Sequence, residues 1–252
     1  VFKFFYGIVA ARILGPEIIG QMAMILSFSG FAYIFINSGF KSRVVQAENI
    51  SKKEINTIFT FNLFMGIILA ILFFLLSNPI ANLYSTPVIS NYIKLFSLSL
   101  ILQSLYIVPL ALNERKLNFK RNTIASVISG TISLIIALIL IIYGFGLLSL
   151  ILYSIINHAF MAIILNLKSE NKSKIFFSYS LFKKHTTYSF NLLFIRIFEE
   201  FFSKIDNILT GKFFNAIELG LFSKSKDLSR LPNSLITSSI NNTLFPVFSK
   251  NK

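Results

Sequence analysis

The stretch NTIASVISGTISLIIALILIIY, residues 122–143, decides the fold class, because it runs for 22 positions without a charged side chain. A helix needs about 20 apolar residues to cross the hydrocarbon core of a bilayer. Only helices and closed barrels pair every backbone N–H and C=O group inside a membrane. The stretch lacks the strict polar–apolar alternation of a barrel strand. It therefore predicts a transmembrane helix.

Further segments of this kind lie on both sides of residues 122–143. Four have a similar length and apolar character: 17–40, 57–76, 88–112 and 145–167. Three others are incomplete or more polar: 1–14, 181–213 and 218–248. Turn residues separate the segments, at Gly15-Pro16, Asn78-Pro79, Gly144 to Gly146 and Asn215. We predict an all-α fold, a polytopic transmembrane helical bundle of eight helices of which the first is truncated.

The composition supports a membrane protein and offers little to an enzyme. Hydrophobic residues make up 54% of the chain and charged residues 13%, whereas a soluble domain carries about 25% charged residues. The chain has no cysteine and two histidines, which are too few for a thiolate or histidine metal centre. No Gly-rich phosphate loop, Gly-x-Ser-x-Gly or His-Glu-x-x-His motif occurs. We predict no metal, no cofactor and no enzymatic activity.

The basic residues predict the orientation in the membrane. Thirteen of the 24 Lys and Arg residues lie in the connections 41–56, 113–121 and 168–184, whereas 77–91 and 144–146 contain none. The positive-inside rule places the first three in the cytoplasm. We expect a multi-pass protein of the cytoplasmic (inner) membrane. Charges spread over such loops do not form a nucleic-acid surface, so we predict no nucleic-acid partner. Residues 43–56 form either an amphipathic surface helix or an ordinary loop.

An internal repeat relates residues 11–23 to residues 211–223 at an offset of 200 positions. The corresponding pairs are Arg12 with Lys212, Gly15 with Asn215, and Gly20 with Gly220. Glycine, and to a lesser degree asparagine, tolerates the left-handed backbone of a tight turn. Each copy therefore predicts a basic helix end, a turn, and a small residue early in the next helix.

Repeats of this kind are typical of transporters built from two similar lobes. We predict an N-terminal transmembrane lobe over residues 1–167, with its first helix truncated, and a cytoplasmic linker over 168–180. Residues 181–252 are predicted to begin the second lobe. Because the chain opens at Val1 inside an apolar stretch, we expect it to be a fragment.

Residues 181–213 carry the densest group of charges inside a candidate helix. A charge at bilayer depth costs about 2.5–3.5 kcal/mol on insertion scales, so these side chains must face water, a partner or one another. At about 100° per residue, most of them share a stripe with Ser203, Asn207 and Thr210. The candidate site residues on this helix are Arg196, Glu199, Glu200, Lys204 and Asp206.

Three interpretations of this stripe are open. The stripe lines a transport cavity, or the helix lies in the membrane interface. In the third interpretation, the i,i+4 pairs Arg196–Glu200 and Glu200–Lys204 form an ionic ladder against a neighbouring helix.

Isolated polar residues in the other segments add weaker candidates. Each amide is either a cavity residue or an interhelical hydrogen bond. These amides are Asn37, Asn62, Gln103 and Asn191. His158 is interpreted either as a packed neutral side chain or as a proton relay.

Several motifs together carry a resemblance that covers essentially the whole chain. They are Ala11-Arg-Ile-Leu-Gly-Pro-Glu-Ile-Ile-Gly20, Pro109-Leu-Ala-Leu-Asn-Glu-Arg-Lys-Leu-Asn-Phe119, Asp206-Asn-Ile-Leu-Thr-Gly211, Leu219-Gly-Leu-Phe-Ser223, Leu231-Pro232 and Leu244-Phe-Pro246. The set resembles the Wzx-like O-antigen flippases, which are polysaccharide exporters of the multidrug/oligosaccharidyl-lipid/polysaccharide (MATE-like) superfamily. The chain departs from their pattern at Lys212, where arginine is usual, and at Asn215, where glycine is usual.

The resemblance implies a MATE-like, V-shaped pair of six-helix lobes around a cavity, of which this chain holds the first lobe and the opening hairpin of the second. The implied cargo is an undecaprenyl-pyrophosphate-linked oligosaccharide, carried to the outer leaflet with a proton or Na⁺ as coupling ion. Arg196 and Lys204 would contact the cargo, and Glu199, Glu200 or Asp206 would bind the ion. Implied partners are membrane lipids and the machinery that polymerises the polysaccharide.

Two other functions compete with this expectation. A multidrug/cation antiporter of the same superfamily would have a cavity dominated by acidic residues, whereas a pyrophosphate carrier needs cationic character. A non-transporting membrane scaffold or enzyme is the other alternative.

Overall fold

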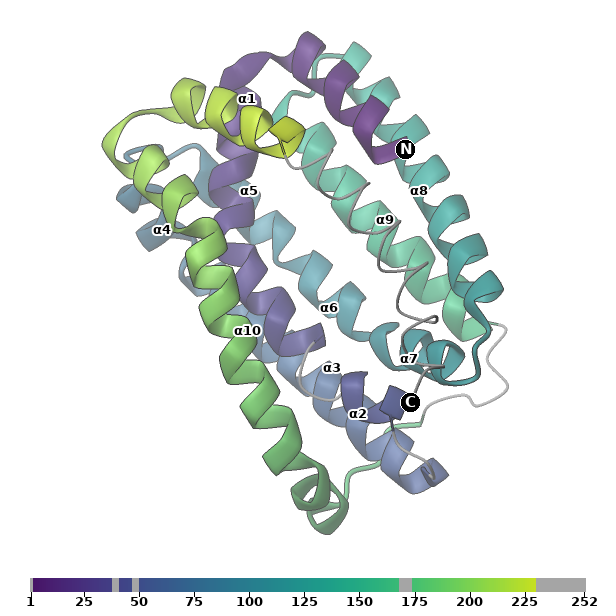
Figure 1. Ribbon diagram of the computed structural model, residues 1–252. Coiled ribbons are helices and arrows are strands. Elements are labelled where there is room, and N and C mark those ends of the chain that lie inside the picture. The colour runs from purple at the N-terminus through teal and green to yellow at the C-terminus, as the bar shows by residue number, and fades with distance from the viewer. Residues whose placement is uncertain (1, 38–40, 47–49, 168–173, 230–252) are drawn as a thin grey trace, which may run out of the picture.

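The computed structural model describes residues 2–37, 41–46, 50–167 and 174–229, and the described part is helical apart from short connections (Figure 1). The N-terminal bundle consists of α1 (Phe2–Asn37), α2 (Lys41–Gln46), α3 (Lys52–Leu75), α4 (Ser77–Leu83), α5 (Ile89–Phe96), α6 (Leu98–Ser104), α7 (Ile107–Arg115), α8 (Phe119–Ile142) and α9 (Leu147–Leu167). Helix α10 (Tyr179–Phe213) follows, and residues 216–229 form a further helix. The predicted all-α fold is confirmed.

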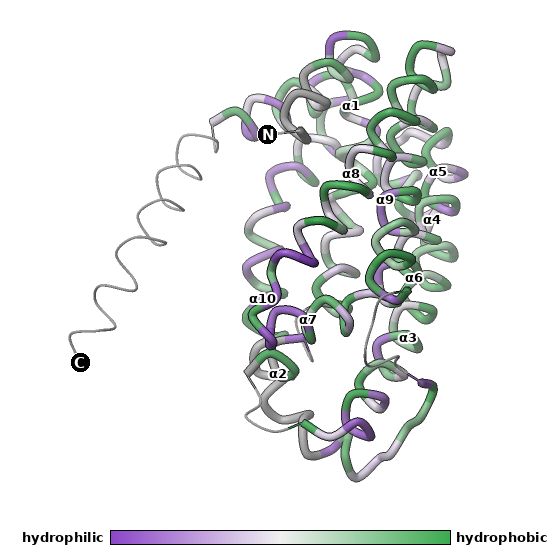
Figure 2. The backbone as a smooth tube through the Cα atoms, turned by 90° about the vertical axis from the view of Figure 1, so that its right-hand side faces the viewer, coloured by the Kyte–Doolittle hydropathy of each residue, from purple (hydrophilic) through white to green (hydrophobic). Residues whose placement is uncertain are grey.

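Within the described residues, five helical stretches are long and apolar enough to cross a membrane. They are Val9–Ile36, Lys52–Leu75, Ile89–Arg115, Phe119–Ile142 and Leu147–Leu167, close to the predicted segments. Large apolar side chains on α3 and α8 are exposed, among them Phe64, Ile71, Ile128 and Ile139, and Figure 2 shows the hydrophobic character of these helices. A lipid environment suits such a surface, and the chain is a multi-pass membrane protein.

Gly15 divides α1 into two helices. Its φ of 77° and ψ of 169° are not helical, and this conformation is accessible to glycine because it lacks a Cβ atom. Pro16 then begins the second helix, where a missing N–H group is tolerated. The predicted break between residues 1–14 and 17–40 is therefore present.

Two segment boundaries differ from the prediction for local reasons. Helix α3 begins at Lys52 rather than near residue 57, because Ser51 and Glu54 form a capping box. The predicted segment 88–112 is divided into α5, α6 and α7. The Ser97 and Ser104 hydroxyls donate to the carbonyls of Lys94 and Ile101, and such bonds compete with the helical ladder.

Part of segment 43–56 is the short helix α2, which packs inward rather than lying on a surface. Val44 is fully buried and belongs to a core cluster with Ile58, Val108 and Leu165. Lys41 forms a 2.9 Å ion pair with Glu114 at the end of α7. The described part of this segment is thus helical at Lys41–Gln46 and again from Lys52, and residues 47–49 lie outside the described residues.

The described parts of the three basic connections lie at one end of the bundle, which we call the basic end (Figure 1). Besides the ion pair between Lys41 and Glu114, the Lys174 N–H group donates to Asn56 Oδ1 at 2.9 Å. Arg121 Nη2 donates to the Leu165 carbonyl at 3.2 Å. The turns at Gly15, 143–146 and 214–215 lie at the opposite end.

Candidate transport site

Helix α10 and residues 216–229 form a hairpin, the α10 hairpin, that packs on α1 through two glycines. A methyl group added at Gly20 would lie 1.7 Å from the carbonyl oxygen of Ala216. A methyl group added at Gly220 would lie 1.9 Å from the carbonyl oxygen of Pro16. Gly20 corresponds to Gly220, and Pro16 corresponds to Ala216, each at an offset of 200 positions. The two copies of the predicted repeat therefore contact each other reciprocally through their backbones.

The two turns of the repeat are built differently. Gly15 has a positive φ, but Asn215 is not among the described residues that do. Instead, Asn215 Oδ1 accepts the Glu218 N–H group at 2.9 Å, which caps the helix that follows. The predicted turn is therefore present at both positions, with a left-handed residue at Gly15 and a helix cap at Asn215.

A second glycine contact lies near the same end of the bundle. The Tyr84 ring covers Gly211 of α10, where an added methyl group would lie 2.6 Å from the ring. Tyr84 also contacts Phe28 edge to face, with ring centroids 6.0 Å apart. Burial raises the pKa of Tyr84 to about 12, so this contact stays uncharged at physiological pH.

The charged side chains of the predicted stripe on α10 do not all point the same way. Arg196 pairs with Glu199 at 2.9 Å, and their side chains are 54% and 58% exposed. The Glu200 carboxylate instead lies against α1, where a methyl group on Gly30 would be 2.0 Å from Oε1. The predicted pair Arg196–Glu200 is replaced by the i,i+3 pair, because Glu200 occupies the space that Gly30 leaves.

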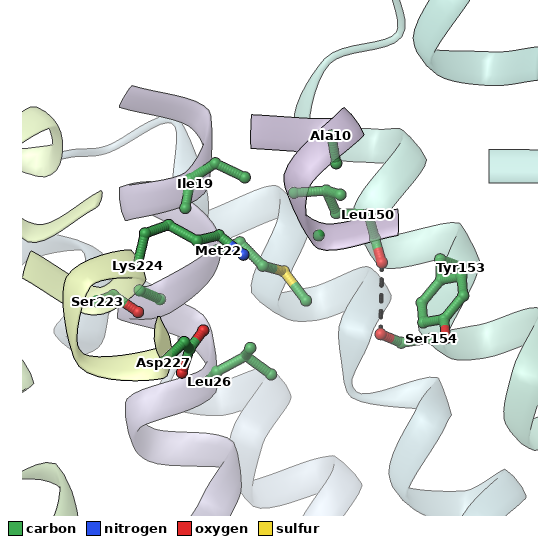
Figure 3. A pocket seen from close by; sticks show the side chains of 12 residues that line it. Ala10, Ile19, Met22, Leu26, Leu150, Tyr153, Ser154, Ser223, Lys224 and Asp227 are labelled. Carbon is green, nitrogen blue, oxygen red and sulfur yellow. Dashed lines mark hydrogen bonds between the residues drawn. The ribbon is translucent and has the colours of Figure 1, made fainter. Parts of the chain in front are cut away.

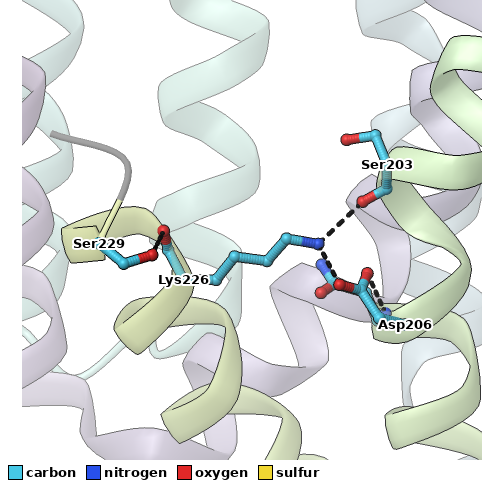
Figure 4. Close-up of polar contacts among 5 residues, drawn as sticks. Ser203, Asp206, Lys226 and Ser229 are labelled. Carbon is cyan, nitrogen blue, oxygen red and sulfur yellow. Dashed lines mark hydrogen bonds and ion pairs between the residues drawn. The ribbon is translucent and has the colours of Figure 1, made fainter. Parts of the chain in front are cut away.

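Asp206 pairs across the hairpin with Lys226, as Figure 4 shows. Lys226 Nζ also donates to the Ser203 carbonyl at 2.9 Å, and Asp206 accepts the Asn207 N–H group at 2.8 Å. The side chain of Lys226 is 18% exposed. Lys226 was not predicted from the sequence, although its position in the charged run 224–227 was a usable signal.

The remaining candidates have simpler outcomes. Lys204 is partly buried, and the structure records no ion pair between Lys204 and Glu200, both of which it describes. The side chains of Asn37 and Asn191 lie outside the described residues. Asn62 is buried, and within the described part of the chain its amide has no hydrogen-bond partner. The predicted interhelical hydrogen bond is therefore not seen for Asn62.

A cavity of about 360 Å³, the hairpin cavity, lies between α1, α9 and residues 216–229. Figure 3 shows Met22 and Leu26 of α1 on one side, Tyr153 and Ser154 of α9 on another, and Lys224 with Asp227 on the third. Its lining is mainly apolar, with one cation and one carboxylate from the hairpin. The sequence analysis missed these two charged residues.

A second cavity of about 390 Å³, the α9 cavity, lies between α8, α9 and the start of α7. Its polar lining comes from Tyr106, Ser126, Thr131, Tyr153, Asn157 and His158. Tyr153 lines both cavities. One face of α9 therefore carries uncharged hydrogen-bonding groups from the hairpin cavity to the α9 cavity, a pattern suited to a polar ligand inside a membrane protein.

These features define a class: a polytopic helical membrane protein with an internal repeat and polar cavities inside the bundle, as in secondary transporters. The chain belongs to the polysaccharide biosynthesis protein family, whose model matches residues 9–252. The resemblance drawn from the sequence motifs is confirmed at this level.

Two curated relatives are similar along most of the chain. It is 24% identical over 240 residues to the succinoglycan biosynthesis transport protein ExoT of Rhizobium meliloti (strain 1021), covering 95% of this chain and 49% of that protein. It is 21% identical over 240 residues to the teichuronic acid biosynthesis protein TuaB of Bacillus subtilis (strain 168), covering 88% and 46%. The chain thus spans about half the length of these relatives. No solved structure matches it.

Proposed function

We propose that the complete protein moves a lipid-linked oligosaccharide for polysaccharide biosynthesis across the cytoplasmic membrane, and that it is a transporter rather than an enzyme. The observation that carries this proposal is the pair of cavities that share Tyr153. Family membership and the printed name of ExoT, a transport protein for succinoglycan biosynthesis, support the same class of cargo.

The lining of the cavities suits an anionic lipid that carries sugars. Lys224 lines the hairpin cavity, and an ammonium group binds phosphate as a point charge. The hydroxyl and amide groups of Ser126, Thr131 and Asn157 offer hydrogen bonds to sugar hydroxyls. Volumes of about 360 and 390 Å³ lie in the lower part of the range of small-ligand sites, so each suits one or two sugar units.

The charges also separate this proposal from the antiporter alternative. An acid-dominated cavity was the signature of a multidrug/cation antiporter. The hairpin cavity contains one lysine and one aspartate, and no charged residue is among those that line the α9 cavity. Neither lining is acid-dominated, which disfavours the antiporter, and neither has the net positive charge expected of a pyrophosphate carrier.

The glycine contacts suggest how the two sides alternate. In this proposal the basic end faces the cytoplasm, by the positive-inside rule, and the contacts at Gly20–Gly220 and Tyr84–Gly211 hold the opposite end closed. Moving the α10 hairpin away from α1 at these points would open the path to the outer leaflet. Such rocking of one repeat against the other is the general mode of alternating access.

The stripe on α10 keeps a proposed role in the cycle. Arg196 and Lys204 would contact the cargo as it enters, and Glu199, Glu200 or Asp206 would bind a proton or Na⁺. Membrane lipids and the polysaccharide polymerase machinery would be the partners.

Complementation tests the proposal in the cell. A strain that lacks the gene should recover surface polysaccharide when it expresses the full-length protein, and should lose most of that recovery with Lys224→Ala. Lys183→Ala, which removes an exposed charge at the basic end, is the matched control and should restore export fully. Normal export in the deletion strain, or equal recovery by both variants, would contradict the proposal.

A further inference from the structure

His158 occupies an unusual position for a titratable side chain in a membrane-spanning helix. It lies on α9 and lines the α9 cavity. Its Nδ1 atom shares a 2.9 Å hydrogen bond with the Tyr106 hydroxyl, in which either atom can be the donor. The imidazole is therefore held by a defined partner and also borders a space large enough for water.

Two aromatic rings flank the imidazole. The Tyr106 ring is stacked at an interplanar angle of 20°, with centroids 5.9 Å apart, and the Tyr33 ring lies at 6.0 Å. Aromatic faces within about 6 Å attract a cation through their quadrupole.

The described residues that line the α9 cavity around His158, and the two aromatic rings against it, are uncharged. Helix α1 contributes Tyr33, whose hydroxyl lies 3.4 Å from Ser99 Oγ of α6. The start of α7 contributes Tyr106, and α9 itself contributes Tyr153 and Asn157. Helix α8 contributes hydroxyl groups and no titratable residue to the cavity lining. Histidine is thus the residue type in this lining whose ordinary titration range lies between about pH 5 and 8.

The carboxylates on α10 have different surroundings. Glu199 is paired with Arg196 and Asp206 with Lys226, so protonating either carboxylate would break an ion pair. Glu200 is packed against α1 at Gly30. His158, by contrast, borders the cavity that we assign to the cargo.

We propose that His158 is a proton-binding site of the transport cycle, positioned by Tyr106. This inference rests on the proposed function for its role in coupling, but proton binding itself does not require the cargo. In the neutral state one ring nitrogen carries a proton. Uptake of one proton from the cavity places a proton on each nitrogen, so that Nδ1–H donates to the Tyr106 oxygen and the Tyr106 hydroxyl rotates to another acceptor. Release of the proton to the other side restores the neutral ring.

The first experiment measures proton binding without cargo. The full-length protein, labelled with ¹⁵N-histidine and held in lipid nanodiscs, is titrated from about pH 5 to pH 8 by NMR, the range in which histidine titrates. The His158 signals are assigned by their loss in His158→Gln, and His185→Gln is the matched control. We expect the His158 signals to titrate, and Tyr106→Phe to move their midpoint by roughly 0.5–1 pH unit, the equivalent of one hydrogen bond. An invariant His158 signal, or a midpoint unaffected by Tyr106→Phe, would overturn the proposal.

The second experiment asks whether the proton is used. Export by the wild type should change by about tenfold over two pH units around the midpoint, since the protonated fraction of a histidine changes by about that factor. His158→Gln should abolish this dependence while His185→Gln keeps it. Export by His158→Gln with unchanged pH dependence would overturn the coupling role. If the wild type exports nothing while His158 still titrates, the proposed function fails and the proton-binding site stands.

Discussion

Helix α9 and the α10 hairpin each contribute a polar wall to the two cavities, and the two walls obtain their polarity in different ways. Helix α9 carries uncharged groups, including Tyr153, Asn157 and His158, and remains apolar enough to span a membrane. The α10 hairpin carries charges, and α10 is not among the stretches apolar enough to span. Uncharged polar groups in a membrane cost little, whereas charges need partners. The α9 wall is therefore stable by itself, and the hairpin wall depends on cross-helix contacts.

The strongest test of this difference removes the backbone contact that seats the hairpin. Gly20→Ala and Gly220→Ala should each cost at least about 1–3 kcal/mol, because the added methyl group would meet a backbone carbonyl at less than 2 Å. Thermal unfolding in detergent, followed by size-exclusion chromatography, measures the loss.

Gly130→Ala on α8 is the matched control for this prediction. The nearest atom to its added methyl group would be Asn157 Nδ2 at 3.9 Å, so stability should change by less than about 0.5 kcal/mol. Equal stability of the three variants would show that the hairpin does not rest on these glycines.

The next effect concerns the charge pair inside the hairpin wall. Lys226→Met should destabilise the protein by about 1.5–3 kcal/mol, because it removes charge-assisted hydrogen bonds to Asp206 and the Ser203 carbonyl. Adding Asp206→Asn to this variant should recover part of the loss, since no unpaired carboxylate then remains. A double-mutant cycle on unfolding midpoints measures the coupling, and strictly additive losses would argue against the pair.

A change on the α9 wall should affect transport more than stability. Asn157 donates a long 3.4 Å hydrogen bond to Ser133, and interhelical bonds in membranes contribute about 0.6 kcal/mol on average. Asn157→Ala should therefore unfold within a few degrees of the wild type but lower the export rate by roughly two- to tenfold, the value of one hydrogen bond to cargo. Unchanged export would remove Asn157 from the cargo path.

The smallest effect on stability is expected at Arg196. Its pair with Glu199 is more than half exposed, and exposed ion pairs contribute about 0–1 kcal/mol. Arg196→Ala should thus unfold with the wild type, so any fall in the export rate reports a contact with cargo. A large loss of stability would contradict the exposed placement of Arg196.

The sequence predicted the bounds of a helix well where one long apolar run defines that helix. Segment 122–143 became α8 (Phe119–Ile142), and 145–167 became α9 (Leu147–Leu167). The start of α3 and the breaks after α5 and α6 were missed because serine side-chain bonds set them. A hydropathy pattern does not register such bonds.

The site was harder to predict because its contacts join different helices. Periodicity within α10 selected Glu200 as a partner for Arg196, yet Gly30 on α1 determines where Glu200 lies. The places of Lys224 in a cavity lining and of Lys226 in an ion pair depend on contacts with α1, α9 and α10, which are separate elements of the sequence. The repeat at Gly20 and Gly220 was readable from sequence, but their mutual contact was visible only in three dimensions.

Leaflet transfer of a defined lipid tests the central claim most directly. The full-length protein is reconstituted into liposomes that contain fluorescent undecaprenyl-pyrophosphate-linked disaccharide, and a membrane-impermeant quencher reports the fraction in the outer leaflet. We predict rapid transfer with the wild type and Lys183→Ala, and slow transfer with Lys224→Ala. Transfer no faster than in protein-free liposomes, or equal rates for Lys224→Ala and the wild type, would contradict the account.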